Sequence, residues 1–239
     1  MSEKCQILHE LFNKKTKLSF PFDKDKIPLN GIYILFEKGE TAHNNDRIVR
    51  IGTHTGRNQL QSRLFQHFLN ENKDRSIFRK NIGRAILSKN KNPFLEYWEL
   101  DLTTRKAREN FAGSIDLKKQ EEIEKEVSKF IQNNFTFIVI PLEDKEKRLE
   151  IESELISTIS SCKECRPSKD WLGNFSPKEK IKKSGLWLVN ELWKNEISEE
   201  NLNFQDFSQK KSKAYKENEF NNEENLNKQE PTLPLNKEV

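Results

Sequence analysis

Gly31-Ile-Tyr-Ile-Leu-Phe36 is a run of β-branched and aromatic residues, a composition typical of a β-strand. Two other segments have the same character: Arg47-Ile-Val-Arg-Ile-Gly52, and Phe135-Thr-Phe-Ile-Val-Ile140, which Pro141 ends. The link between the first two, residues 38–46, is polar and contains a glycine, so we expect an antiparallel hairpin. The three strands together predict a small sheet.

Helical segments surround these strands along the sequence. We predict helices over residues 5–13, 60–69, 76–87, 117–132, 145–160 and 180–194. The fold class is therefore α/β (α+β). We divide the chain into an N-terminal helix and lead-in (1–27), a main domain with a helical insertion and a C-terminal helix (28–198), and a polar low-complexity tail (199–239). The composition of the tail predicts disorder.

Composition excludes several classes of protein. Of the 239 residues, 33% are apolar and 33% charged, and no apolar run approaches the roughly 20 residues that cross a bilayer. The charged start of the chain lacks the apolar stretch of a signal peptide, so we do not expect secretion. Three cysteines, an odd number, argue against a disulfide framework. These features predict a reduced, cytoplasmic protein that does not interact with membranes.

The charge is spread unevenly along the chain. Residues 199–239 contain nine acids and six lysines, which gives a net charge of −3. Because the whole chain carries +4, residues 1–198 carry +7. A basic body is compatible with a polyanionic partner such as nucleic acid, although many lysine-rich proteins simply have solvated faces.

Glu152 is the most informative single residue. At 100° per residue, it lies in the middle of a helical stripe formed by Leu149, Leu155, Ile156 and Ile159. Glu150 and Glu154 point to the opposite, solvent side. A carboxylate on a buried stripe needs an ion-pair partner or a cation, so Glu152 is predicted to be a metal ligand or one half of a buried ion pair.

Three other residues suggest acid–base chemistry on a phosphate. Arg63 and His67 are four residues apart, so they stack on one face of the predicted 60–69 helix. An arginine beside an imidazole at the edge of a core can hold a phosphate and move a proton, but it can also be an ordinary surface pair. On its strand, Tyr33 faces away from Ile32 and Ile34. It can take part in the chemistry, or it can be a half-buried packing residue.

Taken in order, Gly31-Ile32-Tyr33, Arg50-Ile51-Gly52, Arg63 with His67, and Glu152 resemble the GIY-YIG nuclease family over roughly residues 28 to 175. The stretches Val49-Arg-Ile-Gly-Thr-His54, Ser76-Ile-Phe-Arg79, Trp171-Leu-Gly173 and Ser184-Gly-Leu-Trp187 look like a bacterial subgroup of that family. The resemblance implies a three-stranded antiparallel sheet flanked by helices, and cleavage of phosphodiester bonds with one divalent metal ion.

The resemblance also implies roles for individual residues. Tyr33 would be the general base or would orient the attacking water, and His67 would accept the proton of Tyr33. Arg63 would stabilise charge on the phosphate, and Glu152 would bind Mg²⁺ or Mn²⁺. We further expect Arg50, His54, Arg79 and Lys80 to contact the nucleic acid.

The sequence departs from the family pattern at two places. The second motif normally has a tyrosine where this chain has Arg50, whose charge would favour a phenolate at Tyr33 if the two lie side by side. Many members also have an asparagine after the metal-binding glutamate, where this chain has Cys165-Arg-Pro-Ser168; Asn174 lies further along.

Cys162-Lys-Glu-Cys165 has the spacing of half a zinc site. A structural zinc site needs about four ligands, and only Cys5 remains as a third cysteine, while His43 and His54 are distant in sequence. Two reduced thiols in a loop are therefore the favoured interpretation, with zinc as the alternative.

The functional prediction is a divalent-metal-dependent endonuclease acting on duplex DNA, of restriction, repair or mobile-element type. An RNA-cleaving or structure-selective nuclease is one alternative, and a nucleic-acid-binding module without catalysis is another. One active site cuts one strand, so cutting both strands would need a homodimer or two encounters.

Overall fold

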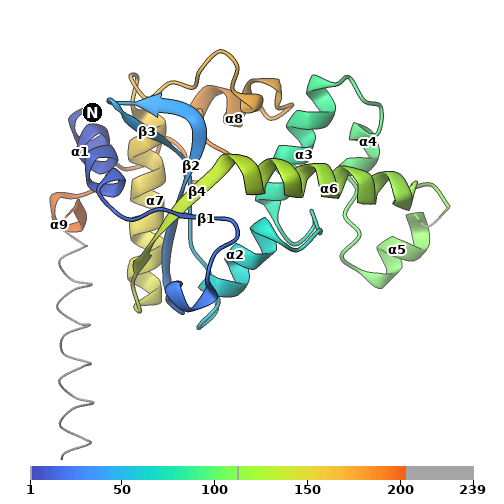
Figure 1. The fold of residues 1–239 in the computed structure, drawn as a ribbon, viewed down its shortest axis with the longest axis horizontal. Helices are drawn as coiled ribbons and strands as arrows, with labels where there is room; N and C mark the ends of the chain where they lie inside the picture. The colour runs from blue at the N-terminus through green and yellow to red at the C-terminus, as the bar shows by residue number, and fades with distance from the viewer. Residues whose placement is uncertain (1, 112, 203–239) are drawn as a thin grey trace, which may run out of the picture. The chain divides into compact units, whose positions relative to one another are not determined.

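The computed structural model describes residues 2–111 and 113–202. They form a mixed α/β fold around an antiparallel sheet, which confirms the predicted fold class (Figure 1). Residues 1–198 form one compact unit and residues 199–239 another, of which the helix α9 (Glu199–Leu202) is described. The disorder predicted for the tail concerns residues that lie mostly outside the described part.

The sheet has four strands in the order β1-β4-β2-β3, with β2 (Gly31–Ala42) between β3 (Asn45–Gly52) and β4 (Phe135–Pro141). Tyr33 pairs with Gly52 on one side and Val139 on the other. The predicted hairpin is present, but its strands are longer than expected. They are joined at His43 and Asn44, whose φ angles of 52° and 58° suit a tight two-residue turn.

The sequence prediction missed the strand β1. It consists of Leu18 and Ser19, which pair with Phe137 and Thr136 of β4. A two-residue strand is too short to show an alternating pattern, so nothing in the sequence distinguishes it from the lead-in that was predicted there.

One face of the sheet carries Tyr33 and Leu35 and is covered by α2 (Leu60–Phe68), α3 (Ile77–Lys89) and α6 (Leu117–Asn134). These helices contribute apolar side chains to one continuous core, among them Leu60, Leu64, Phe68, Phe78, Ile82, Ile123, Val127 and Ile131. The core therefore surrounds the face on which the candidate catalytic tyrosine lies.

The helices α1 (Ser2–Asn13) and α7 (Lys145–Ser161) contact each other and the strand β3, and both lie away from α3 and α6 (Figure 1). Asp144 caps the N-terminus of α7 by accepting a hydrogen bond from the backbone N–H of Lys147. Along α7, Glu152 lies next to Thr53, the residue that follows the end of β3.

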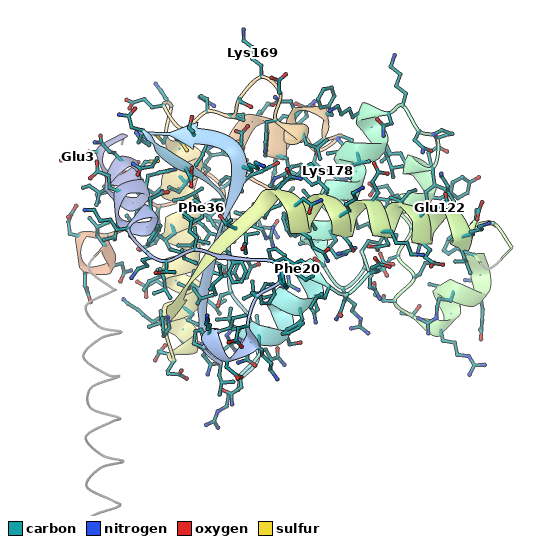
Figure 2. The ribbon with its side chains drawn as sticks, viewed as in Figure 1. Glu3, Phe20, Phe36, Glu122, Lys169 and Lys178 are labelled. Atoms are coloured by element: carbon teal, nitrogen blue, oxygen red, sulfur yellow. The ribbon has the colours of Figure 1, made fainter. Side chains whose placement is uncertain are left out.

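Short elements complete the fold: η1 (Lys24–Lys26), α4 (Leu95–Trp98), α5 (Arg105–Phe111), η2 (Leu172–Phe175) and α8 (Glu179–Ser184). The helices α4 and α5 belong to the predicted helical insertion, and Glu122 lies on the part of α6 nearest α5 (Figure 2). The predicted helix over 180–194 is wrong beyond Ser184. Gly185 has a φ of 71° and donates its N–H to the carbonyl of Ile181, a left-handed cap that ends the helix.

Within the described ranges, no helix is both long enough and apolar enough to cross a membrane.

Candidate active site

A chain of hydrogen bonds joins Tyr33, His67 and Ser76 in the core. The Tyr33 hydroxyl lies 2.8 Å from His67 Nε2, and His67 Nδ1 lies 2.8 Å from the Ser76 hydroxyl. Ser76 is the N-cap of α3, where its oxygen also accepts the N–H of Arg79. Because the Ser76 oxygen is held by the cap, it can fix the ring orientation and tautomer of His67.

His67 is fully buried, and burial lowers its pKa well below the usual value. The positive charges of Arg50, Arg63 and Arg79 lower it further. His67 is therefore a neutral imidazole at physiological pH. In the tautomer that donates its Nδ1–H to Ser76, its Nε2 accepts a hydrogen bond from the Tyr33 hydroxyl.

This pKa shift predicts an acid-sensitive fold. Between the folded pKa and the unfolded pKa of about 6.5, only the unfolded chain binds the His67 proton, so stability is lost as pH falls below about 6.5. The slope from one such group is at most about 1.4 kcal/mol per pH unit. His67→Gln should make the free energy of unfolding less dependent on pH between 5 and 6.5, as measured by urea denaturation. An unchanged dependence would contradict a neutral buried His67.

Arg50 lies beside Tyr33, as the sequence interpretation required. Its Nε donates to the Tyr33 hydroxyl at 3.4 Å and its Nη1 donates to the Trp187 carbonyl at 2.5 Å. The guanidinium also lies over the Phe78 ring, and Arg50 is only 3% exposed. Arg50 is therefore bound within the protein, in a position to act on Tyr33 rather than on a DNA phosphate.

Gly52 connects this buried group to the metal-ligand candidate. A Cβ at Gly52 would come within 2.2 Å of the Tyr33 hydroxyl oxygen, so only glycine allows the tyrosine to lie across from it. The next residue, Thr53, donates its backbone N–H to Glu152 Oε1 at 2.9 Å. Gly52, which pairs with Tyr33, and Thr53, which binds Glu152, therefore lie between the two side chains.

Glu152 lines a polar hollow of about 320 Å³. Its carboxylate is half-buried, and desolvation raises its pKa, although the Thr53 N–H and the charge of Arg50 oppose the shift. The hollow is lined by residues of the β3 end, α2 and α7: Thr53, His54, Thr55, Gln59, Ser62, Arg63, Gln66, Leu149 and Glu152. Sequence reasoning found three of these; the others lie next to them along the chain or one helical turn away.

The other two acids of α7 differ in part from the prediction. Glu150 is exposed and pairs with Lys147, as expected of the solvent side. Glu154 was expected to face solvent as well, but it is half-buried and accepts the backbone N–H of Ser198. Helical direction alone could not show that a later segment covers this side of α7.

Arg63 and His54 line the same hollow as Glu152. Arg63 donates to the Gln66 side chain and to the Arg75 carbonyl, both at 3.2 Å, and pairs with no carboxylate among the described residues. His54 donates its Nδ1–H to the Gly56 carbonyl (2.6 Å), while its buried Nε2 has no hydrogen-bond partner within the described chain. Buried nitrogen atoms in proteins usually have a hydrogen-bond partner, so His54 Nε2 can still accept one from a water molecule or a bound group.

Arg79 and Lys80, which are expected to contact nucleic acid, both bind groups of the protein in this structure. Arg79 is fully buried and forms a bidentate ion pair with Glu124. Lys80 donates to the Glu99 carbonyl at 2.9 Å and lies near Asp74. Neither residue lines the hollow, and both side chains have protein partners. Asn174, in turn, binds the carbonyls of its own loop.

A search of protein families matches residues 3–217 to a GIY-YIG domain. Comparison with the curated proteins and with the solved structures gave no significant match. The match covers most of the chain and includes every residue of the hollow and of the Tyr33–His67–Ser76 chain. The chain therefore belongs to the GIY-YIG domain family, which supports a function of the nuclease type.

Proposed function

We propose that this protein is a divalent-metal-dependent endonuclease that hydrolyses phosphodiester bonds in DNA. The observation that carries the proposal is the shared hollow: the Glu152 carboxylate and the Arg63 guanidinium line it together, and the Tyr33–His67 pair lies directly behind its wall. A carboxylate that can bind a metal ion and an arginine without a carboxylate partner among the described residues line the same polar hollow, and together they suit an anionic substrate.

The donor set of the hollow fits magnesium or manganese. Glu152 supplies a carboxylate, and the neighbouring Thr53, Thr55 and Ser62 supply oxygen atoms for bound water. Magnesium typically takes one or two carboxylates and completes its shell with water and substrate phosphate oxygens. When bound at Glu152, the ion would polarise the phosphate and neutralise the charge that develops during hydrolysis.

The chain's own residues would supply the proton transfer. Tyr33 orients or deprotonates the attacking water, and the neutral His67 accepts the phenolic proton at Nε2. Ser76 keeps the imidazole in the tautomer that can accept it. Arg63 then stabilises the developing charge on the phosphate, and His54 contacts the substrate from the same hollow.

One observation favours the alternative of a binding module without catalysis. Tyr33 is only 1% exposed and does not line the hollow, so water reaches its hydroxyl only if Arg50 or the Gly52–Thr53 backbone shifts. In the catalytic proposal, substrate binding at Arg63 and Glu152 provides that shift. In the alternative, the hydrogen-bonded tyrosine is purely structural.

A plasmid assay separates these two functions. The full chain is incubated with supercoiled plasmid in Mg²⁺, in Mn²⁺ or in EDTA, and binding is measured in parallel by gel shift. We expect metal-dependent nicking or linearisation. Binding without cleavage in either metal would support the module. Cleavage of RNA or branched DNA but not of plasmid would support the RNA-cleaving or structure-selective alternative.

Arg50→Ala should slow the chemical step without changing the electrostatic part of DNA binding. Its guanidinium is occupied by Tyr33 and Trp187, so its loss disturbs the tyrosine rather than a phosphate contact. Single-turnover cleavage across a pH series measures the first effect, and the salt dependence of the Kd measures the second. A flatter salt dependence with a normal cleavage rate would instead identify Arg50 as a phosphate ligand. Arg63→Ala is the matched comparison, and we expect it to change both the cleavage rate and the salt dependence of the Kd.

We also propose a reducing, cytoplasmic location. Whether both strands are cut by a homodimer or in two encounters would follow from the oligomeric state and the order in which nicked and linear plasmid appear.

A further inference from the structure

All three cysteines of the chain and two of its four histidines lie in one buried cluster, away from the hollow of Glu152. Its members are Cys5 on α1, His9 one turn later, His43 in the β2–β3 turn, and Cys162 and Cys165 after α7. The cysteines are at most 2% exposed, and the His43 side chain is 4% exposed. Three distant segments therefore bring their sulfur and imidazole groups to one point.

The sulfur–nitrogen distances in the cluster are close to those between zinc ligands, and the Cys162–His43 distance joins two of the ligands proposed below. The three sulfur–nitrogen pairs are Cys5–His9 at 3.6 Å, Cys162–His43 at 3.5 Å and Cys165–His9 at 3.7 Å. Cys5 also lies close to both other thiols, and its sulfur lies within 4.8 Å of a ring nitrogen of His43. In a tetrahedral zinc site with Zn–S near 2.3 Å and Zn–N near 2.0–2.1 Å, adjacent sulfur and nitrogen ligands lie about 3.6 Å apart.

We propose that Cys5, His43, Cys162 and Cys165 bind one zinc ion as a closed structural site. Three thiolates and one imidazole form a common tetrahedral zinc ligand set, and Cys162 and Cys165 have the two-residue spacing typical of such sites. The site replaces the earlier interpretation of two unrelated reduced thiols, because the folded chain supplies the ligands that sequence distance concealed.

His43 rather than His9 is the imidazole ligand because the ring of His9 is already occupied. His9 Nδ1 lies 2.9 Å from the Cys5 carbonyl, and its Nε2 accepts the backbone N–H of Ile48 at 3.2 Å. His43 has its Nε2 against Cys162 and its Nδ1 3.8 Å from the Glu164 carboxylate. A carboxylate behind a metal-bound histidine is a common way to orient its ring.

The surroundings also suit a metal thiolate. Three thiolates on Zn²⁺ leave one negative charge, and the fully buried Arg47 lies near Cys165, where it also forms an ion pair with Glu40. The site would fasten α1 to the hairpin turn and to the end of α7.

The test is the metal content of the full chain, expressed with added zinc and purified without chelator. We expect one zinc per chain by inductively coupled plasma mass spectrometry, and a thiolate–cobalt charge-transfer band after exchange with Co²⁺. Cys162→Ser and His43→Asn should lose the zinc and lower the Tm by about 10 °C or more, since a structural zinc contributes directly to folding. Asparagine tolerates the left-handed backbone at position 43.

Matched variants separate this site from the proposed nuclease site. His9→Gln, His54→Ala and Glu152→Gln should each retain one zinc. A wild-type chain that carries no zinc and shows no cobalt band, or that contains a disulfide between Cys162 and Cys165, would overturn the proposal. Loss of zinc from His9→Gln together with its retention in His43→Asn would overturn the ligand assignment. Because these measurements involve no DNA, they stand whether or not the protein cleaves it.

Discussion

Glu152→Gln is expected to reduce metal-dependent cleavage by about 10³-fold while leaving DNA binding nearly unchanged. Charge stabilisation by a bound divalent ion is worth several kcal/mol, and each 1.4 kcal/mol is a factor of ten in rate. The amide keeps the shape of the side chain and can still accept the Thr53 N–H at its oxygen. It removes the negative charge, so it tests metal binding rather than folding. Cleavage is measured under single-turnover conditions and binding by fluorescence anisotropy.

Glu150→Gln is the matched control, because Glu150 lies on the same helix, is exposed, and pairs with Lys147 at the surface. It should cleave at the wild-type rate. Equal losses in the two variants would refute the assignment of Glu152 as the metal ligand.

Glu152 also predicts how the metal requirement changes with pH. Burial raises the pKa of its carboxyl group, so protons compete with the metal at a higher pH than at an exposed glutamate. The Mg²⁺ concentration for half-maximal cleavage should therefore increase as the pH is lowered toward 5.

The direction of Glu152 on its helix and the face on which Tyr33 lies were predictable because both depend on local periodicity. A helix repeats every 3.6 residues and a strand every two, so a short sequence shows which side chains share a face. The long helices α6 and α7 and the strand β4 were predicted within two residues for the same reason, whereas β2 continues to Ala42, six residues beyond its predicted end. Their apolar patterns were strong, and their ends carried Asp caps or a proline.

The cysteine cluster and the pairing of Arg79 could not be predicted in this way. Cys162 and His43 are 119 residues apart, and Arg79 and Glu124 are 45 apart. Only the folded chain brings such partners together, and no local pattern specifies which cation meets which anion. The basic stretch after Ser76 therefore looked like a nucleic-acid contact, although Arg79 is used inside the core.

Tyr33→Phe and His67→Gln are each expected to slow cleavage by about 10²-fold or more, and the double variant should be no slower than the more damaged single variant. Proton transfer by a positioned side chain typically contributes 10²–10⁴-fold. The 2.8 Å contact makes the two residues one unit, so removing either breaks the same transfer. Independent packing roles would instead give losses that multiply.

The measurement is single-turnover cleavage at saturating enzyme, with the Tm of each variant determined alongside. Tyr97→Phe serves as the control, because Tyr97 is 42% exposed and lies on α4, outside the hollow. Phenylalanine at position 33 keeps the ring but leaves His67 Nε2 without its partner, so some loss of stability is expected as well. A Tyr33→Phe variant that is less stable but cleaves at the wild-type rate would show that the buried pair only supports the core. A catalytic pair requires the rate to fall at temperatures where the variant is fully folded.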